Sequence, residues 1–224
     1  MQPLILSAVS ADYGGERVVG PLSLTIEPGQ RVALVGRSGA GKSTLLGIMY
    51  ERCRNQAALM PQQLGLVDTL SVFHNVYMGR LAAHATWYNL RNLAWPARRE
   101  VATITGLLEQ LDMADKLQSR TGELSGGQRQ RVAAARAMYQ NGDVLLADEP
   151  VSALDGPLAE VVMSALTRSY KTAVLAMHDV ELALRYTDRV VGINDGLITV
   201  DEPSARLCVE DLRPLYDTEA GVLV

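Results

Sequence analysis

Residues 36–43, Gly-Arg-Ser-Gly-Ala-Gly-Lys-Ser, have the types and the spacing of a phosphate-binding loop, G-x-x-x-x-G-K-S. The glycines have no Cβ, so backbone N–H groups can turn inward and approach phosphate oxygens. Lys42 offers a mobile positive charge to the β- and γ-phosphates of a nucleotide, and the Ser43 hydroxyl is a ligand for Mg²⁺. The alternative is a chance glycine-rich turn, which the flanking segments argue against.

The loop lies between two segments that can position it. Residues 31–35 are a short, apolar, β-prone run, and residues 44–50 can continue as a helix. Strand, loop and helix in this order are the context that the motif requires, and the positive end of the helix adds to the attraction for phosphate. The stretch therefore predicts binding of nucleotide phosphates, a property that many unrelated NTPases share.

Two further apolar runs end in side chains that can do chemistry. Residues 144–147 predict a central parallel strand that ends at Asp148 and Glu149. Carboxylates at that end of a strand face the ligand crevice of an open α/β sheet, where one can hold Mg²⁺ and the other can orient a water. A solvated strand end is the alternative. Residues 172–177 predict another buried strand, and His178 at its tip is well placed for a γ-phosphate, although a lone histidine is usually structural.

Ser125, Gly126 and Gly127 lie just ahead of a helical run at residues 129–139. They form a second helix N-terminus that suits an anion. Taken alone, these residues predict only an N-capped helix.

The other segments complete a pattern of alternating strands and helices. Trp87 and Trp95 are interpreted as packing residues of a helical insertion, with exposed aromatics near a partner surface as the alternative. A hairpin is predicted around Asn194-Asp195-Gly196, and Ser71 is a predicted N-cap. The predicted strands span residues 3–11, 22–26 and 57–60, the predicted helices span residues 73–78 and 101–111, and a helical, acidic tail follows Pro203.

The composition limits the function classes. A chain of 224 residues with 48% hydrophobic side chains predicts one α/β domain with a helical insertion. A net charge of −4 and 5% aromatic residues give no indication of a nucleic-acid partner. Cys53 and Cys208 have no metal-ligand spacing and suggest ordinary thiols in a reduced cytosolic protein. The sequence shows neither a signal-peptide pattern nor a run long enough to span a membrane, so we expect any role at a membrane to need another chain.

Nearly the whole chain resembles the ATP-binding-cassette ATPases, because its motifs follow one another in the order found in that family. The phosphate loop comes first, and residues 124–128, Leu-Ser-Gly-Gly-Gln, come after it. These five residues match the family signature, which separates the family from other phosphate-loop NTPases. The resemblance implies an α/β fold of the P-loop NTPase class with a mostly parallel central sheet, antiparallel N-terminal strands and a helical signature subdomain. It implies one domain over residues 1–224, with the helical subdomain at about 68–140 inserted in the core.

The resemblance also implies site residues for ATP and Mg²⁺. Glu149 matches the general base, His178 the γ-phosphate switch, and Gln62, chosen over Gln63, the glutamine that touches Mg²⁺ and the attacking water. Asp148 joins Ser43 and Gln62 as the residues expected at the metal. The expected nucleotide contacts are Tyr13, which matches the residue stacked on adenine, the loop residues Gly36, Arg37, Ser38, Gly39, Ala40, Gly41, Lys42, Ser43 and Thr44, the signature residues Ser125, Gly126, Gly127 and Gln128, and Asp155.

The family pairs two such domains head to tail, so the resemblance implies a homodimer. Ser125 and Gly127 of one subunit would contact the ATP held by the other, and Asp155 would close the loop that crosses between subunits. The other implied partners are integral membrane permease subunits and, indirectly, a solute-binding protein. These place the chain in the cytoplasm, peripheral on the inner face of the membrane. Import is favoured over export because no membrane segment is fused to the cassette.

Within the family, residues 62–67, residues 70–81 and Thr86-Trp87 resemble the ATPases of phosphonate importers, which suggests a phosphonate or related oxyanion as the solute. A soluble cassette ATPase that accompanies an enzyme assembly, such as a phosphonate-cleaving complex, is the alternative function. A nucleotide-switch module with little turnover is a third, which Glu149 and His178 argue against.

One segment departs from the family pattern. Only residues 44–61 separate Ser43 from Gln62, where the family has a longer stretch that forms an antiparallel β arm. We therefore expect that arm to be shortened or absent, with fewer contacts around the adenine and ribose.

Overall fold

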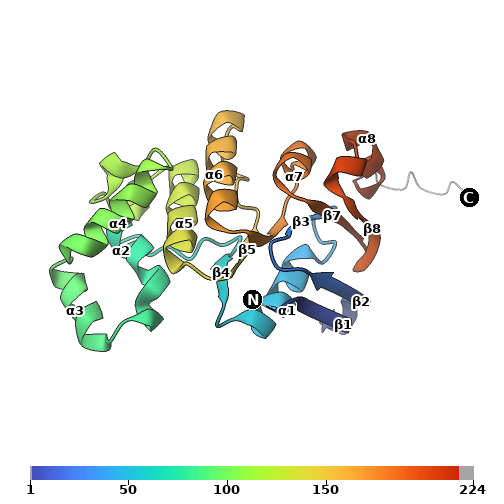
Figure 1. Cartoon of the computed structure of the whole chain (residues 1–224), viewed down its shortest axis with the longest axis horizontal. Helices are drawn as coiled ribbons and strands as arrows, with labels where there is room; N and C mark the ends of the chain where they lie inside the picture. The colour runs from blue at the N-terminus through green and yellow to red at the C-terminus, as the bar shows by residue number, and fades with distance from the viewer. Residues whose placement is uncertain (1, 217–224) are drawn as a thin grey trace, which may run out of the picture. The chain divides into compact units, whose positions relative to one another are not determined.

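The computed structural model describes residues 2–216, except for the side chains of Tyr13 and Glu16. These residues form two compact units, each described by itself below (Figure 1). Unit 1 comprises Met1–Arg54, Leu146–Glu149 and Lys171–Val224, and unit 2 comprises Asn55–Leu145 and Pro150–Tyr170. The predicted helical insertion at residues 68–140 falls within unit 2, and its status as a separate subdomain stays a prediction.

A mostly parallel sheet forms the centre of unit 1. Its strands run in the order β5-β6-β3-β7-β8, with β3 parallel to both neighbours. Val32 of β3 lies opposite Val174 of β6 and Arg189 of β7. Strands β3, β5, β6 and β7 are mainly apolar and largely buried, as a parallel sheet requires, whereas the antiparallel edge strand β8 is mostly exposed. They span Arg31–Val35 (β3), Val144–Asp148 (β5, of which the end belongs to unit 1), Thr172–Ala176 (β6), Arg189–Asn194 (β7) and Leu197–Pro203 (β8, antiparallel to β7).

The first two strands of unit 1 form a separate antiparallel pair (Figure 1). In its register Leu4 lies opposite Ile26, and Leu6 lies opposite Leu24. All four side chains are buried, so this pair adds an apolar face to the core of the unit. The remaining elements of unit 1 are β1 (Leu4–Tyr13), β2 (Glu16–Ile26), α1 (Lys42–Cys53), α7 (Val180–Tyr186), α8 (Val209–Leu212) and the 3₁₀ turns Ser204–Arg206 and Arg213–Leu215.

Unit 2 is mainly helical. Its one complete strand, β4 (Ala57–Met60), lies beside the start of β5, where the N–H groups of Asp143 and Val144 donate to the Gln56 carbonyl. The helices are α2 (Val72–Tyr77), α3 (Thr86–Ala94), α4 (Arg98–Glu109), α5 (Gly126–Gln140) and α6 (Gly156–Ser169), with 3₁₀ turns at Met78–Ala83, Ala114–Lys116 and Thr121–Glu123. Helix α5 is buried along most of its length and packs against α2, α4 and α6.

The predicted fold class is confirmed: the structure is α/β, with a mostly parallel sheet, an antiparallel N-terminal pair and a helical group that contains α5. The expected shortening between Ser43 and Gln62 is confirmed as well, because only residues 54–56 separate α1 from β4 and leave no room for an antiparallel arm. The tail after Pro203 forms short helices up to Leu215, and the rest of it lies outside the described residues.

The interpretation of the two tryptophans as packing residues is wrong. Trp87 is 66% exposed and Trp95 is 77% exposed, at the two ends of α3. Helical spacing shows which residues share a face, but it does not show whether another element covers that face.

The strand β3 is held at its start by an ion pair with the residue before β7. The Asp188 carboxylate accepts hydrogen bonds from Arg31 Nη2 at 2.8 Å, Nε at 3.1 Å and the backbone N at 2.9 Å. The side-chain hydrogen bond from Arg31 outweighs the effect of burial and lowers the pKa of Asp188. A lowered pKa means that the stabilisation is present above the ordinary pKa of aspartate and is lost as the pH falls through the lowered value.

We therefore expect Asp188→Asn to lower the free energy of unfolding at pH 7 by about 1–2 kcal/mol, allowing for partial solvent exposure. The difference from the parent should shrink as the pH falls below about 4. Urea unfolding at both pH values measures this. Asp12→Asn weakens a more exposed pair with Arg17 and is the control, with little expected change. A pH-independent loss at Asp188 would contradict the ion-pair explanation.

Candidate functional site

The phosphate-binding loop connects β3 to α1 in unit 1, and two of its glycines are required by the backbone. Gly36 has a φ of 144°, and a Cβ there would lie 2.2 Å from the carbonyl oxygen of Ile193. Gly41 has a φ of 101° and caps the start of α1. The first hydrogen bond of α1 runs from the Leu45 N–H to the Gly41 carbonyl at 2.9 Å. The preceding N–H groups are therefore those that a helix start leaves for an anion.

Lys42 is a buried cation inside this loop. Its side chain is only 6% exposed, and its Nζ donates to the carbonyl oxygens of Gly36 at 2.7 Å and Arg37 at 2.9 Å. Burial lowers the pKa of Lys42, whereas the negative charges of Glu149 and Asp148 oppose that change. The ammonium is thus within electrostatic reach of both carboxylates, and its hydrogen bonds to two carbonyls hold the loop around it.

The predicted catalytic residues Glu149 and His178 are brought together in unit 1. His178 Nε2 lies 2.9 Å from Glu149 Oε1, and the Glu149 N–H donates to the Ala176 carbonyl at 2.9 Å. Glu149 has a φ of 52°, a left-handed conformation that few residues other than glycine and asparagine adopt. Such strain is frequent at functional sites. Asp148, the last residue of β5, is 9% exposed.

Tyr216 contributes to this group, although no sequence pattern indicated it. Its hydroxyl oxygen accepts the Gly36 N–H at 3.3 Å, and its O–H donates to the His178 carbonyl at 3.5 Å. The residue thus connects the start of the loop with the histidine from a position far along the chain. Burial raises the pKa of the Tyr216 phenol, so it stays protonated and able to donate.

In unit 2 the signature residues form the predicted helix start. The Ser125 hydroxyl accepts from the Gln128 N–H at 3.3 Å, and Gln128 Oε1 accepts from the Ser125 N–H at 2.9 Å. This capping box leaves the proton of the Ser125 hydroxyl available for a ligand. Gly127 lies against the loop that follows β5, since a Cβ there would be 3.0 Å from the Ala153 carbonyl.

Two further predicted residues also belong to unit 2. Asp155 caps α6, where its carboxylate accepts from the Leu158 N–H at 3.2 Å. Gln62 is exposed in the segment after β4. The side chain of Arg136 on α5 holds that segment through hydrogen bonds to the carbonyls of Leu64 and Gly65. Tyr13 ends β1, and the adenine contact predicted for its side chain lies outside the described residues.

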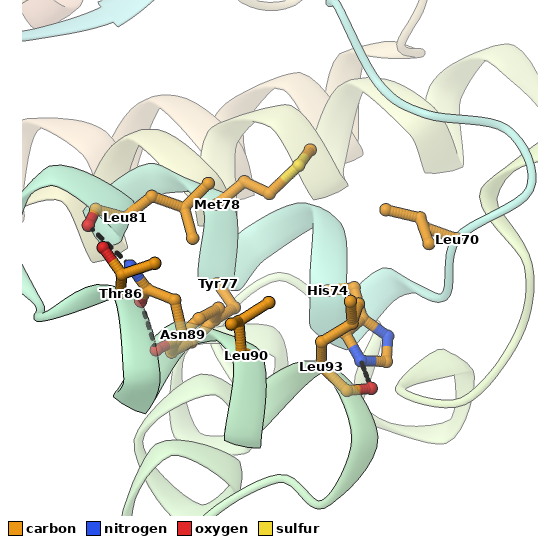
Figure 2. A pocket seen from close by; sticks show the side chains of 9 residues that line it. All are labelled: Leu70, His74, Tyr77, Met78, Leu81, Thr86, Asn89, Leu90 and Leu93. Carbon is orange, nitrogen blue, oxygen red and sulfur yellow. Dashed lines mark hydrogen bonds between the residues drawn. The ribbon is translucent and has the colours of Figure 1, made fainter.

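Sequence patterns did not reveal an apolar pocket in unit 2 (Figure 2). It has a volume of about 240 Å³ and lies between the segment 70–81 and α3. Leu90 and Leu93 border it and are 64% and 55% exposed. The Tyr77 hydroxyl donates to Asn89 Oδ1 at 2.9 Å, which fixes α3 against α2. The lining residues are Leu70, His74, Tyr77, Met78, Leu81, Thr86, Asn89, Leu90 and Leu93.

Within residues 2–216 no helix is both long and apolar enough to cross a membrane. The same residues contain no cluster of three or more His, Cys, Asp or Glu side chains suited to a metal ion. A protein-only metal cage is therefore absent from the described part of the chain.

A phosphate loop between a parallel strand and a helix, with two carboxylates at the end of another strand of the sheet, defines a P-loop NTPase. The comparisons give its family. The ABC transporter family model matches residues 19–152. The phosphonates import ATP-binding protein PhnC 2 of Rhodopseudomonas palustris (strain BisA53) is 37% identical, over 97% of this chain and 91% of that protein. The phosphonates import ATP-binding protein PhnC of Bradyrhizobium diazoefficiens has the same identity and coverage.

Solved structures agree with this assignment. A dimeric bacterial ABC transporter cassette is similar with a TM-score of 0.78 and 26% identity, over 89% of this chain and 98% of that chain. A dimeric cassette in a post-hydrolysis state, bound to ADP and phosphate, has a TM-score of 0.73 and 25% identity over the same shares. This chain belongs to the ABC transporter family as an ATP-binding, ATP-hydrolysing subunit. Its alignment with PhnC 2 spans 247 positions, more than its own 224 residues, so that relative carries residues within the match that this chain lacks.

The geometry of the loop predicts unequal effects of two alanine substitutions. Gly36 and Gly39 both have positive φ angles, but a Cβ at Gly39 would meet nothing within 4 Å. We expect Gly36→Ala to cost about 1–3 kcal/mol more unfolding free energy than Gly39→Ala, because only Gly36 is pressed against the Ile193 carbonyl. Denaturant unfolding of the two variants measures the difference. Equal stabilities would show that the close approach at Gly36 does not constrain the fold.

Proposed function

We propose that this chain powers the import of a phosphonate or a related oxyanion through separate membrane subunits. The proposal depends mainly on the apolar pocket beside α3, whose rim consists of exposed apolar side chains. The described residues of this ATPase include no membrane-spanning helix. The names of the similar import ATP-binding proteins support the direction of transport and the solute class. The chain would then work on the cytoplasmic side, peripheral to the membrane.

Mg²⁺ fits the donor set of the phosphate loop. Magnesium takes only one or two protein oxygens and fills its other positions with phosphate and water, so a full protein cage is not needed. The Ser43 hydroxyl at the start of α1 and the Asp148 carboxylate at the end of β5 are oxygen donors of this kind in unit 1. The bound ion would neutralise phosphate charge during transfer. That Gln62 also touches it stays a prediction.

The residues of unit 1 divide the chemistry of ATP hydrolysis between them. The Lys42 ammonium would exchange its carbonyl acceptors, those of Gly36 and Arg37, for β- and γ-phosphate oxygens. Glu149 would accept the proton of the attacking water as general base. His178, hydrogen-bonded to Glu149, would contact the γ-phosphate and report its presence. Tyr216 would hold the backbone of His178 beside the phosphate loop through its two hydrogen bonds.

The signature residues would act on the ATP of a second copy of the chain. Ser125 offers a hydroxyl proton, and the start of α5 offers backbone N–H groups and the positive end of a helix dipole. Gly126 and Gly127 allow the phosphates to approach closely. The similarity to dimeric cassettes supports a head-to-tail homodimer in which Asp155 lies at the crossing loop. Loss of the γ-phosphate would remove the bridge, and the dimer would open.

The pocket beside α3 would receive a cytoplasmic helix of the membrane subunits. Monomeric soluble proteins seldom expose several large apolar side chains together, and such patches mark interaction sites. Leu90, Leu93 and the two tryptophans are all more than half exposed around α3. An amphipathic helix that lays its apolar face in the groove would bury them.

We expect Glu149→Gln to retain ATP binding and to lower the ATPase rate by about 10²–10⁴-fold, the usual contribution of a general base. The amide keeps the shape of the side chain and cannot take the proton. Nucleotide binding and phosphate release measured on the same preparation test this. Turnover at the parental rate in the variant would remove Glu149 from the mechanism.

The docking proposal is tested by a tagged pull-down from gently solubilised native membranes, with Glu149→Gln and ATP to hold the closed dimer. We expect recovery of an integral membrane protein, reduced at least about tenfold by Leu90→Asp, because a leucine contact worth about 1.5–3 kcal/mol is replaced by a charge. Leu197→Asp alters a similarly exposed leucine of unit 1 and is the matched control. Recovery of soluble enzymes alone would support the accessory role instead.

A further inference from the structure

We propose that the Glu100 carboxylate is a positioning group that couples α3, which borders the docking pocket, to α5, which begins at the signature residues. The proposal rests on the proposed function in one respect, namely that α3 receives the membrane partner and that Ser125 contacts ATP. The coupling itself is a more limited claim: a displacement at the start of α5 moves α3, and Glu100 transmits this displacement.

Three helices of unit 2 meet at this carboxylate. Glu100 lies in the first turn of α4 and is 7% exposed. The Tyr139 hydroxyl, from α5, donates to Glu100 Oε2 at 2.5 Å, and the Tyr88 hydroxyl, from α3, donates to Oε1 at 2.9 Å. Each oxygen of one carboxylate thus holds a different helix.

The physical chemistry of a buried carboxylate makes these contacts obligatory. Removal of a charged group from water is costly unless hydrogen bonds replace the solvent. Burial alone would raise the pKa of Glu100, but the hydrogen bonds from Tyr139 and Tyr88 outweigh it, with smaller contributions from His84 and Arg99, and the pKa is lowered. The position in the first turn of α4 adds the positive end of a helix dipole. Without its acceptor, the phenol of Tyr139 would be a buried, unsatisfied donor, and that of Tyr88 a half-buried one.

Helix α5 provides the mechanical path. It is one uninterrupted helix with Ser125 at its N-cap and Tyr139 next to its last residue. Its 15 residues span about 22 Å and are packed along most of their length, so a displacement at Ser125 is carried to Tyr139. From Tyr139 the path needs only the Glu100 carboxylate and the Tyr88 hydroxyl to reach α3.

A second path to α3 exists and must be separated from the first. Asn89 accepts from the Tyr77 hydroxyl at 2.9 Å, and the Leu93 carbonyl lies 3.2 Å from His74 Nε2. Both contacts join α3 to α2, which packs on α5. A test must therefore cut the Glu100 connection and leave these contacts in place.

The chain contains its own reporters for this test. Its only two tryptophans, Trp87 and Trp95, lie at the two ends of α3, so intrinsic tryptophan fluorescence reports on this helix alone. In the Glu149→Gln chain we expect ATP to shift the tryptophan emission as the dimer closes. Tyr139→Phe removes one hydroxyl of the Glu100 cluster and should abolish that shift, while ATP binding and dimer formation in size-exclusion chromatography persist.

Tyr170→Phe is the matched control. It also removes a buried phenol that bonds to α5, at the Ala137 carbonyl, but does not touch Glu100. This variant should keep the shift. Glu100→Gln retains an oxygen for one of the two phenols and should reduce the shift, which keeps the test informative if Tyr139→Phe fails to fold.

Three results would overturn the coupling. The first is no shift of the tryptophan emission with ATP in the Glu149→Gln chain, and the second is an undiminished shift when Glu100→Gln or Tyr139→Phe is added to it. The third is that Tyr170→Phe abolishes the shift as Tyr139→Phe does. The second result would assign the transmission to α2. Failure of the membrane pull-down with an intact fluorescence response would reject the proposed docking and leave the coupling standing.

Discussion

The buried ammonium of Lys42 is the constraint on which the nucleotide site depends. A cation that is removed from water must be given acceptors, and here the Gly36 and Arg37 carbonyls of its own loop supply them. The loop is therefore already folded around the ammonium, and under the proposed function phosphate oxygens would replace the two carbonyls. The glycine at position 36 makes this geometry possible, because the loop runs directly beside the Ile193 carbonyl.

The two units use the same device for opposite purposes. In unit 1 the buried charge of Lys42 is bound by two backbone carbonyls that a ligand could replace, whereas in unit 2 the buried charge of Glu100 is bound by two phenols from two helices. The first arrangement allows the acceptors of a charge to be exchanged, and the second fixes helices in relation to one another. A chain that converts binding into motion needs both an adaptable contact and a rigid connection.

Much of the fold could be predicted because its signals are local. The phosphate loop, the apolar strands and the capped start at Ser125 each depend on residues close together in sequence. The exposure of Trp87 and Trp95 could not be predicted, since it depends on which elements cover α3. Tyr216 was missed for a related reason: its contact with Gly36 joins residues 180 positions apart, and no spacing rule connects them. Glu100 looks in the sequence like one more charge on a helix surface.

The backbone conformation at Glu149 has a consequence for attempts to raise the thermal stability of this protein. Its left-handed conformation is one that glycine or asparagine adopts with less strain, so the residue that we propose as general base is not the residue that the backbone prefers. Under the proposed mechanism, thermal stability and turnover would therefore be opposed at this single position. A selection for heat resistance alone would tend to enrich chains that still bind nucleotide but no longer hydrolyse it.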